Sequence, residues 1–215
     1  MKAHDFKPWC HALVLTSLLV GCGGVEGGGD AVEDSNPEAV SAALATSARG
    51  RVTPEKHCVT RAQSLKPGAP LPEPSAAPPE DCFPTFSEAI SFATRGAIRL
   101  PLTAKPADLK EEDLKAAPVP SGLPYAIGIG YTETGFSGSS IVFTAVENCG
   151  AILYASMPSG WNDAISSMQT FMGSRCRHSF LFEHVNFQGA SLDCGLGCNS
   201  LGVLNKQTSS IFWTQ

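Results

Sequence analysis

The C-terminal part of the chain alternates short apolar runs with segments rich in Gly, Ser and Asn. The runs lie at residues 126–131, 141–145, 152–155 and 179–182. Several short apolar runs separated by such turn residues are typical of antiparallel strands in a sandwich or barrel. The pattern therefore predicts an all-β domain over residues 124–215.

The preceding segment, residues 58–123, is rich in Pro and Ala and has helical patterns instead of strands. Thr85 and Glu88 have the spacing of a capping box, which begins a short helix. Residues 107–117 predict a second short helix. We expect this segment to pack on the C-terminal domain through three apolar side chains, Phe86, Ile90 and Phe92.

The N-terminal end has the pattern of an export signal, residues 1–21. Lys2 and Lys7 flank its start, and the apolar run at 12–20 is much shorter than the roughly 20 residues of a membrane-spanning helix. The run ends in Leu-Val-Gly-Cys22, which resembles the bacterial lipobox. The resemblance implies cleavage before Cys22 and a diacylglycerol on its thiol. A plain secretory signal with an incidental cysteine is the alternative.

Residues 22–57 are Gly-rich, then acidic and Ala/Ser-rich, with almost no aromatic side chains. Such a segment buries too little apolar surface to offset the entropy of ordering, so it predicts a flexible tether. Gly23 after the cysteine resembles lipoproteins that are sorted to the outer membrane in cells with two membranes. The sequence thus predicts a cell-envelope protein whose contact with the membrane is its lipid anchor.

Six of the eight cysteines follow Cys22. An even number of cysteines in an exported chain favours disulfides, although sequence alone leaves every pairing open. A zinc site is the rival interpretation, but the last two cysteines have no second Cys or His pair at zinc spacing. Proximity along the chain favours three pairs, Cys58–Cys82, Cys149–Cys176 and Cys194–Cys198.

The charge of the chain argues against nucleic acid as a partner. The formal net charge is −5, and loss of Lys2, Lys7 and Asp5 with the signal leaves 13 basic and 19 acidic residues, or −6. Nucleic-acid binding usually needs a basic patch, which this composition does not provide.

Two short motifs each occur twice within residues 124–215. The first, at 131–138 and 182–189, has two aromatic residues five positions apart, followed two positions later by Gly. Gly135 and Asn186 precede the second aromatic residue and tolerate the left-handed backbone of a folded-over hairpin. We expect the two aromatic side chains of each motif to pack together. The second motif, Asn-x-x-x-Ser-Ser, precedes an apolar strand in both copies.

Together these motifs resemble the βγ-crystallin superfamily. Its Greek-key motif carries an aromatic-x4-aromatic-x-Gly hairpin, and its microbial calcium-binding members add the run (Asn/Asp)-(Asn/Asp)-x-x-(Ser/Thr)-Ser. Both parts occur in order across residues 124–215, which is under half of the chain. The resemblance implies a sandwich of two four-stranded Greek keys. An unrelated β-sandwich with ordinary tight turns is the alternative.

The resemblance also implies calcium as a cofactor, bound between the hairpin of one motif and the loop of the other. Oxygen donors suit such a hard cation. Lys206 stands where the family pattern has Asn or Asp, so we expect one stronger site and one weak or empty site. The alternative is that the loops only cap their own turns. The implied ligands are Asn162, Asp163, the Ala164 carbonyl, Ser166, Asn205, the Gln207 carbonyl, Ser209, Glu183, and Glu133 displaced by one place.

No catalytic motif is present in the sequence. It contains neither His-Glu-x-x-His nor Gly-x-Ser-x-Gly, and His57, His178 and His184 have no marked catalytic partner. The order of residues alone does not exclude a Ser–His–acid triad. The sequence therefore favours a protein that is not an enzyme.

Two functional classes remain. The first is a calcium-binding structural or stress-protective module in the cell envelope. The second is an exported peptidase inhibitor, because small bacterial metalloproteinase inhibitors resemble a single disulfide-tied domain of this kind. In that case the loop at 157–160 or the loop closed by Cys194 and Cys198 would enter the cleft of the protease.

Overall fold

The computed structural model describes residues 54–66, 69–71, 77–116, 123–147 and 149–215. These residues belong to one compact unit, Val52–Gln215. The expected signal, Cys22 and all of the expected tether before residue 54 lie outside the described residues. Within the described part of the chain, no helix is long and apolar enough to cross a bilayer.

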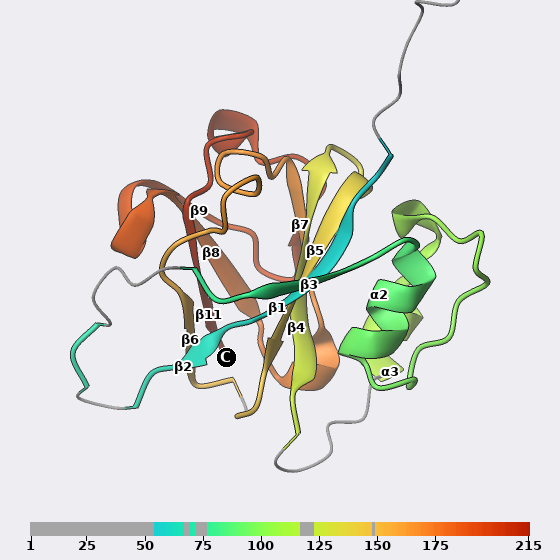
Figure 1. Ribbon diagram of the computed structural model, residues 1–215. Helices are drawn as coiled ribbons and strands as arrows, with labels where there is room; N and C mark the ends of the chain where they lie inside the picture. The colour runs from blue at the N-terminus through green and yellow to red at the C-terminus, as the bar shows by residue number, and fades with distance from the viewer. Residues whose placement is uncertain (1–53, 67–68, 72–76, 117–122, 148) are drawn as a thin grey trace, which may run out of the picture. The chain divides into compact units, whose positions relative to one another are not determined.

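Two β-sheets, A and B, form the body of this unit (Figure 1). Sheet A has the order β10-β7-β4-β5-β1-β3 and sheet B the order β2-β6-β11-β8-β9. Sheet A consists of β10 (Gly197–Cys198), β7 (Ser167–Thr170), β4 (Tyr125–Glu133), β5 (Ser137–Ala145), β1 (His57–Arg61) and β3 (Glu80–Phe83). Sheet B consists of β2 (Gln63–Ser64), β6 (Ala151–Tyr154), β11 (Ser210–Thr214), β8 (His178–His184) and β9 (Gln188–Asp193).

The strand order shows two Greek keys that exchange one strand. Strands β4 to β7 form the first key and β8 to β11 the second. In each key, the first, second and fourth strands lie in one sheet and the third crosses to the other, so that β6 joins sheet B and β10 joins sheet A. The all-β Greek-key sandwich predicted for residues 124–215 is confirmed. Short 3₁₀ turns complete the connections: η2 (Met172–Ser174), η3 (Val185–Phe187) and η4 (Gly202–Leu204).

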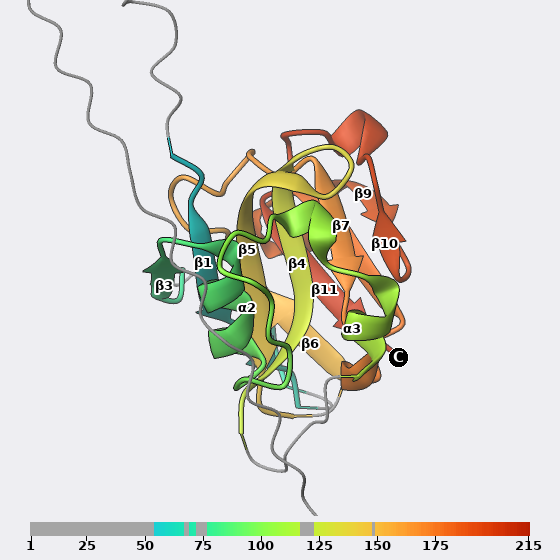
Figure 2. The ribbon, with the colours of Figure 1, turned by 90° about the vertical axis from the view of Figure 1, so that its right-hand side faces the viewer.

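Two apolar cores lie on either side of sheet A. The first fills the space between the sheets and contains Trp161 and Trp213. The second lies between sheet A and a helical layer made of α2 (Phe86–Ala93), η1 (Pro106–Asp108) and α3 (Glu111–Ala116). Figure 2 shows α2 and α3 over the face of β4 and β5. Because both faces of β4 are covered, seven consecutive residues of this strand are buried, which explains its unbroken apolar sequence.

The predicted capping box of α2 is confirmed. Thr85 and Glu88 exchange side-chain to backbone hydrogen bonds at the start of the helix. Phe86 and Ile90 are buried as expected, but the prediction for Phe92 is wrong, because its side chain is 54% exposed. Two residues on from Ile90, Phe92 lies on the opposite side of the helix, where its ring is 5.0 Å from that of Phe83.

Besides the helical layer, the segment before residue 124 contributes strands to both sheets. Strand β1 pairs in parallel with β5 and antiparallel with β3, and β2 pairs with β6. We call β1, β2 and β3 with residues 54–56 the N-terminal arm; it extends both sheets of the sandwich. Its first strand begins at His57, the last residue of the expected tether, and the side chain of His57 is buried.

All three predicted disulfides are present. Cys58–Cys82 joins the directly paired residues of β1 and β3, Cys149–Cys176 ties the start of β6 to the loop before β8, and Cys194–Cys198 closes the loop between β9 and β10. Because their sulfurs are bonded to each other, Cys194 and Cys198 do not offer the thiolates of a zinc site.

Candidate functional site

The two repeated hairpins have the same geometry. Tyr131 and Phe136 pack with ring centroids 5.8 Å apart, and Phe182 and Phe187 do so at 5.6 Å. The expected left-handed residues, Gly135 and Asn186, have φ angles of 69° and 57°. The aromatic residue that follows each of them is left-handed as well, with φ of 59° and 62°. Both hairpins therefore fold back over their strands as the motif predicts.

The second serine of each Asn-x-x-x-Ser-Ser motif fastens its loop to the hairpin of the same Greek key. Ser167 Oγ donates to the carbonyl of Glu133 at 2.6 Å and accepts from the amide of Phe136 at 3.1 Å. Ser210 Oγ donates to the carbonyl of His184 at 2.7 Å and accepts from the amide of Phe187 at 3.0 Å. These serines hold the scaffold together and leave other positions of the loops to face the partner motif.

The two loops pair with each other across a local two-fold relation. The amide of Asp163 donates to the carbonyl of Thr208 at 3.2 Å, and the amide of Lys206 donates to the carbonyl of Ile165 at 2.8 Å. Asp163 and Lys206 both have left-handed φ angles, 58° and 56°. Asp163 of the first Greek key and Lys206 of the second thus each lie against the other key.

Asp163 lies with oxygen donors of the second key in one open hollow, which we call the Asp163 site and define as Asp163, Glu183, Gln207 and Ser209. His184 and Lys206 also line this hollow. Ser209 Oγ donates to Asp163 Oδ1 at 3.4 Å, and Glu183 Oε2 accepts from the amide of Ala190 at 3.1 Å. Carboxylate, hydroxyl and carbonyl oxygens are the donor types that calcium prefers, so this set fits the ion.

The equivalent place on the first hairpin holds an ammonium group. Lys206 Nζ lies 3.4 Å from Glu133 Oε1, and both side chains are about half exposed. Ser166 Oγ, the counterpart of Ser209, donates instead to the carbonyl of Thr132 at 2.8 Å. A cation supplied by the chain itself therefore lies beside the carboxylate that an external cation would use.

The structure sorts the nine candidate ligands into three groups. Asp163, Glu183, Gln207 and Ser209 meet at one hollow. On the other side, Glu133 lies beside Lys206, while the hydroxyl of Ser166 is engaged by the first hairpin. The remaining three are Asn162, which donates to Asp163 Oδ2 at 2.7 Å, the partly buried Ala164, and Asn205, which is exposed and does not line the hollow.

Among the described residues, one Ser–His–acid arrangement has a buried serine and a buried histidine. His57 Nδ1 is 3.0 Å from Ser140 Oγ, and His57 Nε2 is 3.8 Å from a carboxylate oxygen of Glu55. Burial lowers the pKa of His57, and the nearby charge of Glu55 opposes part of this effect. Because Ser140 is fully buried, its hydroxyl has no access to a substrate in this conformation. The other two histidines of the described residues, His178 and His184, lie at the surface, with His178 paired to Asp193 at 2.9 Å.

Two residues that were not predicted from the sequence are linked to the turn of Asp163. Trp161 directly precedes the Asn162–Asp163 pair, and its indole Nε1 donates to Glu80 Oε2 of β3 at 2.6 Å. The position of the tryptophan next to the motif was a usable signal. Glu80 has no such signal, because 81 residues separate it from Trp161.

Comparisons with known proteins find similarity among solved structures. No protein-family model and no curated protein matches the chain. Among solved structures, an archaeal βγ-crystallin is 23% identical and covers 42% of this chain and 98% of its own, with a TM-score of 0.30. The N-terminal domain of Protein S is 20% identical, over 40% and 92%, with a TM-score of 0.31. A double mutant of a βγ-crystallin domain from Clostridium beijerinckii is 17% identical, over 41% and 98%, with a TM-score of 0.31.

Proposed function

We propose that this chain is a non-catalytic, exported cell-envelope protein whose βγ-crystallin-like domain binds one calcium ion at the Asp163 site. The observation that carries the proposal is the meeting of Asp163 from the first Greek key with Glu183, Gln207 and Ser209 from the second. All four offer oxygen to a cation, and they lie in an open hollow that an ion can enter from solvent.

A single ion follows from the difference between the two loops. Asp163 places a carboxylate at the second hairpin, whereas Lys206 places an ammonium at the first. The ammonium removes one anionic ligand and adds a like charge near any divalent cation. The Glu133 side of the domain is therefore the weak or empty site.

The ion would act as a clamp between the two Greek keys. Its ligands come from both keys, so the site is complete only when the keys are packed together. An ion that binds only the folded state stabilises it by RT ln(1 + [L]/Kd). This gain supports a structural or stress-protective role in an envelope where calcium is supplied from outside.

Isothermal titration of the mature chain with Cys22→Ser, purified oxidised and without lipid, tests the calcium site. We expect one calcium ion per chain and a rise in Tm that EDTA reverses. Absence of both heat and Tm shift would refute the proposed cofactor, whereas two equal sites would refute the proposed asymmetry.

The envelope location is a separate part of the proposal. Three disulfides suit an oxidising, exported environment, and the lipobox-like run supports a lipid on Cys22, with outer-membrane sorting in a cell that has two membranes. Mass spectrometry of the protein extracted from membranes should find acylated Cys22 at the N-terminus. A secreted chain with unmodified Cys22 would contradict this location.

Peptidase inhibition is the second candidate function, and one exposed residue favours it. Leu196 is 42% exposed within the loop that the Cys194–Cys198 disulfide closes. In the other candidate loop, at 157–160, Met157 and Pro158 are buried and only Ser159 and Gly160 are exposed. An assay against a thermolysin-like protease, with Leu196→Asp as the matched variant, decides this case: equal activity with and without the protein excludes inhibition of that protease.

A further inference from the structure

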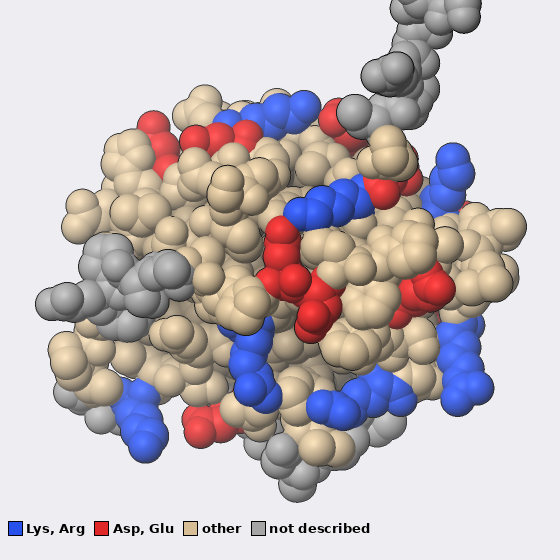
Figure 3. Space-filling view, in the orientation of Figure 1, with Lys and Arg blue, Asp and Glu red and all other residues tan. Residues whose placement is uncertain are grey.

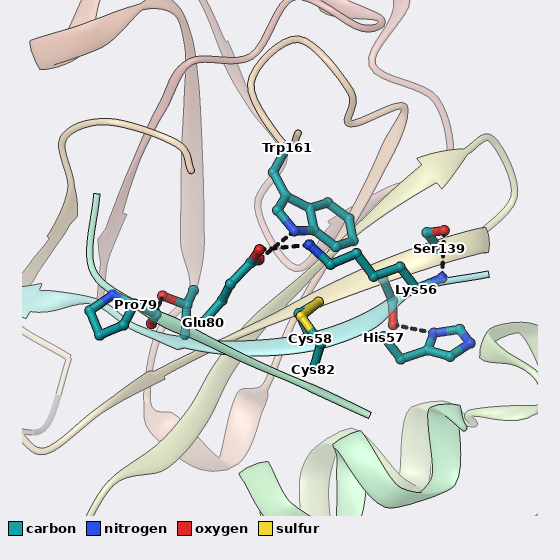
Figure 4. Close-up of a disulfide and its surroundings, with 10 residues drawn as sticks. Lys56, His57, Cys58, Pro79, Glu80, Cys82, Ser139 and Trp161 are labelled. Atoms are coloured by element: carbon teal, nitrogen blue, oxygen red, sulfur yellow. Dashed lines mark hydrogen bonds and ion pairs between the residues drawn. A yellow bond between two sulfur atoms is a disulfide. The ribbon is translucent and has the colours of Figure 1, made fainter. Parts of the chain in front are cut away.

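The N-terminal arm contacts Trp161, two residues before Asp163, from outside the two Greek keys. Strand β3 is the edge strand of sheet A, and its neighbour in the sheet is β1. The Cys58–Cys82 disulfide joins the two strands in the middle of their pairing (Figure 4). Residues at the start of β3 are therefore held at a defined place over the sandwich.

Glu80, the first residue of β3, uses both of its carboxylate oxygens. Oε1 is 2.6 Å from Lys56 Nζ, and Oε2 accepts from Trp161 Nε1 at 2.6 Å, as Figure 4 shows. Lys56 Nζ also lies 5.7 Å from the centroid of the Trp161 ring. The surface over β1 and β3 accordingly carries acidic and basic side chains next to each other (Figure 3). Two residues of the arm thus hold one indole of the sandwich.

Trp161 is the anchor of the turn that presents Asp163. Its side chain is 1% exposed and belongs to the core between the sheets. Its amide donates to the carbonyl of Pro158 at 2.9 Å, and its carbonyl accepts from the amide of Ala164 at 3.2 Å. Asp163 therefore lies inside the turn that the hydrogen bond between Trp161 and Ala164 closes. Trp161 is in turn bonded to Pro158.

A fixed indole lowers the cost of binding an ion at this turn. Ordering the backbone of a residue costs conformational entropy, and a site that is ordered beforehand avoids this cost when the ligand arrives. If Glu80 is removed, the buried indole N–H loses its acceptor, and the turn must be ordered by the ion instead. Removal of the Glu80 carboxylate should therefore weaken calcium binding at Asp163.

We propose that Glu80 is a positioning residue for the Asp163 site: held in place by the Cys58–Cys82 disulfide, it fixes Trp161 and, through Trp161, the turn that carries Asp163. The inference rests on the proposed function for its effect on calcium, but not for its effect on the turn. The N-terminal arm would then support the cation site through Glu80 and Trp161, in addition to extending the sheets.

The test compares Glu80→Ala with Asp81→Ala in the oxidised mature chain carrying Cys22→Ser. Asp81 is the next residue of β3, is exposed, and makes no ion pair among the described residues. We expect Glu80→Ala to raise the calcium Kd about tenfold, as a loss of about 1.4 kcal/mol in binding would. Asp81→Ala should leave the Kd unchanged. Glu80→Gln keeps an acceptor for the indole and should restore most of the affinity.

A second measurement does not depend on calcium. In ¹⁵N-labelled protein with EDTA, Glu80→Ala should speed hydrogen exchange of the Trp161 indole N–H and of the Asp163 amide. The indole N–H of Trp213, which is buried and has no hydrogen-bond partner among the described residues, serves as the internal reference. Unchanged exchange in Glu80→Ala overturns the inference whether or not calcium binds. Faster exchange with no calcium binding by the wild type refutes the proposed function and, with it, the effect on affinity, while the hold on the turn stands.

The disulfide is tested by a double-mutant cycle. Cys58→Ala with Cys82→Ala should weaken calcium binding as Glu80→Ala does, because β3 then no longer holds the carboxylate in place. The combined variant should be little weaker than either alone, since both act through the same contact. Additive losses of affinity would show that the disulfide and Glu80 act independently and would overturn this part of the inference.

Discussion

The first hairpin lies beside Lys206, and the second hairpin lies beside Asp163, although both loops have the same backbone. The residues that build each unit are equivalent: an aromatic pair, two left-handed residues and a serine that bonds the hairpin twice. The residues that would face an ion are not equivalent. The backbone of the two motifs is thus set by residues that both motifs share, whereas cation binding depends on Asp163 and Lys206, in which they differ.

The largest effect is expected from a substitution in the proposed calcium site. Asp163→Ala removes the carboxylate that the first Greek key contributes to the hollow. At a calcium concentration of about 100 Kd, the wild type should gain about 2.7 kcal/mol in its free energy of unfolding, and the variant should gain almost none. Thermal unfolding with calcium and with EDTA measures the difference. An equal calcium-dependent rise in Tm in both proteins would remove Asp163 from the site.

The next effect tests whether the two scaffolds are truly equivalent. Ser167→Ala and Ser210→Ala each leave a hairpin carbonyl and a hairpin amide without their partner. We expect each to lower the free energy of unfolding by about 1–3 kcal/mol, with or without calcium. Urea unfolding in EDTA measures both, with the exposed Ser159→Ala as control. A large loss in one variant and none in the other would contradict the equivalence.

A smaller effect is expected at the first hairpin, where one substitution should create a second calcium site. Lys206→Asp replaces the ammonium beside Glu133 with a carboxylate. The variant should bind two calcium ions where the wild type binds one. Without calcium its stability should change by less than about 1 kcal/mol, because the lost ion pair is exposed. Titration calorimetry measures the number of ions bound per chain. Lys206→Ala is the control, because it removes the ammonium without adding a ligand. A stoichiometry of one in Lys206→Asp would mean that the first hairpin lacks other ligands.

The smallest effect concerns the left-handed position of each hairpin. Gly135→Asn and Asn186→Gly exchange the two residues that occupy it. Each should change the free energy of unfolding by about 0.5 kcal/mol or less, because both residue types tolerate this backbone and nothing lies within 4 Å of a Cβ at Gly135. Gly138→Ala is the contrasting variant, since its Cβ would lie 2.6 Å from Thr132 Oγ1 at a φ of 79°. Chemical denaturation that ranked Gly135→Asn with Gly138→Ala would reject this account of the hairpin.

Features that depend on near neighbours were predictable from the sequence. The hairpins, the capping box of α2 and the serine-containing loops each need a few residue types within about eight positions, and the structure has all of them where the motifs place them. The disulfides also follow from proximity along the chain. Phe92 shows the limit of this approach: it is apolar, but the helix turns it away from the core.

The sequence alone was enough to predict a β-sandwich, and its two repeated motifs, which resemble those of βγ-crystallins, implied the two Greek keys. Three features become visible only in the folded chain: β1 and β3 extend sheet A, Asp163 and Glu183 line one hollow while Lys206 lies beside Glu133, and Glu80 accepts a hydrogen bond from Trp161. Strand addition uses backbone hydrogen bonds, which any residue but proline supplies, and contacts between residues far apart in the chain depend on how the strands are ordered. Neither leaves a periodic mark in the sequence.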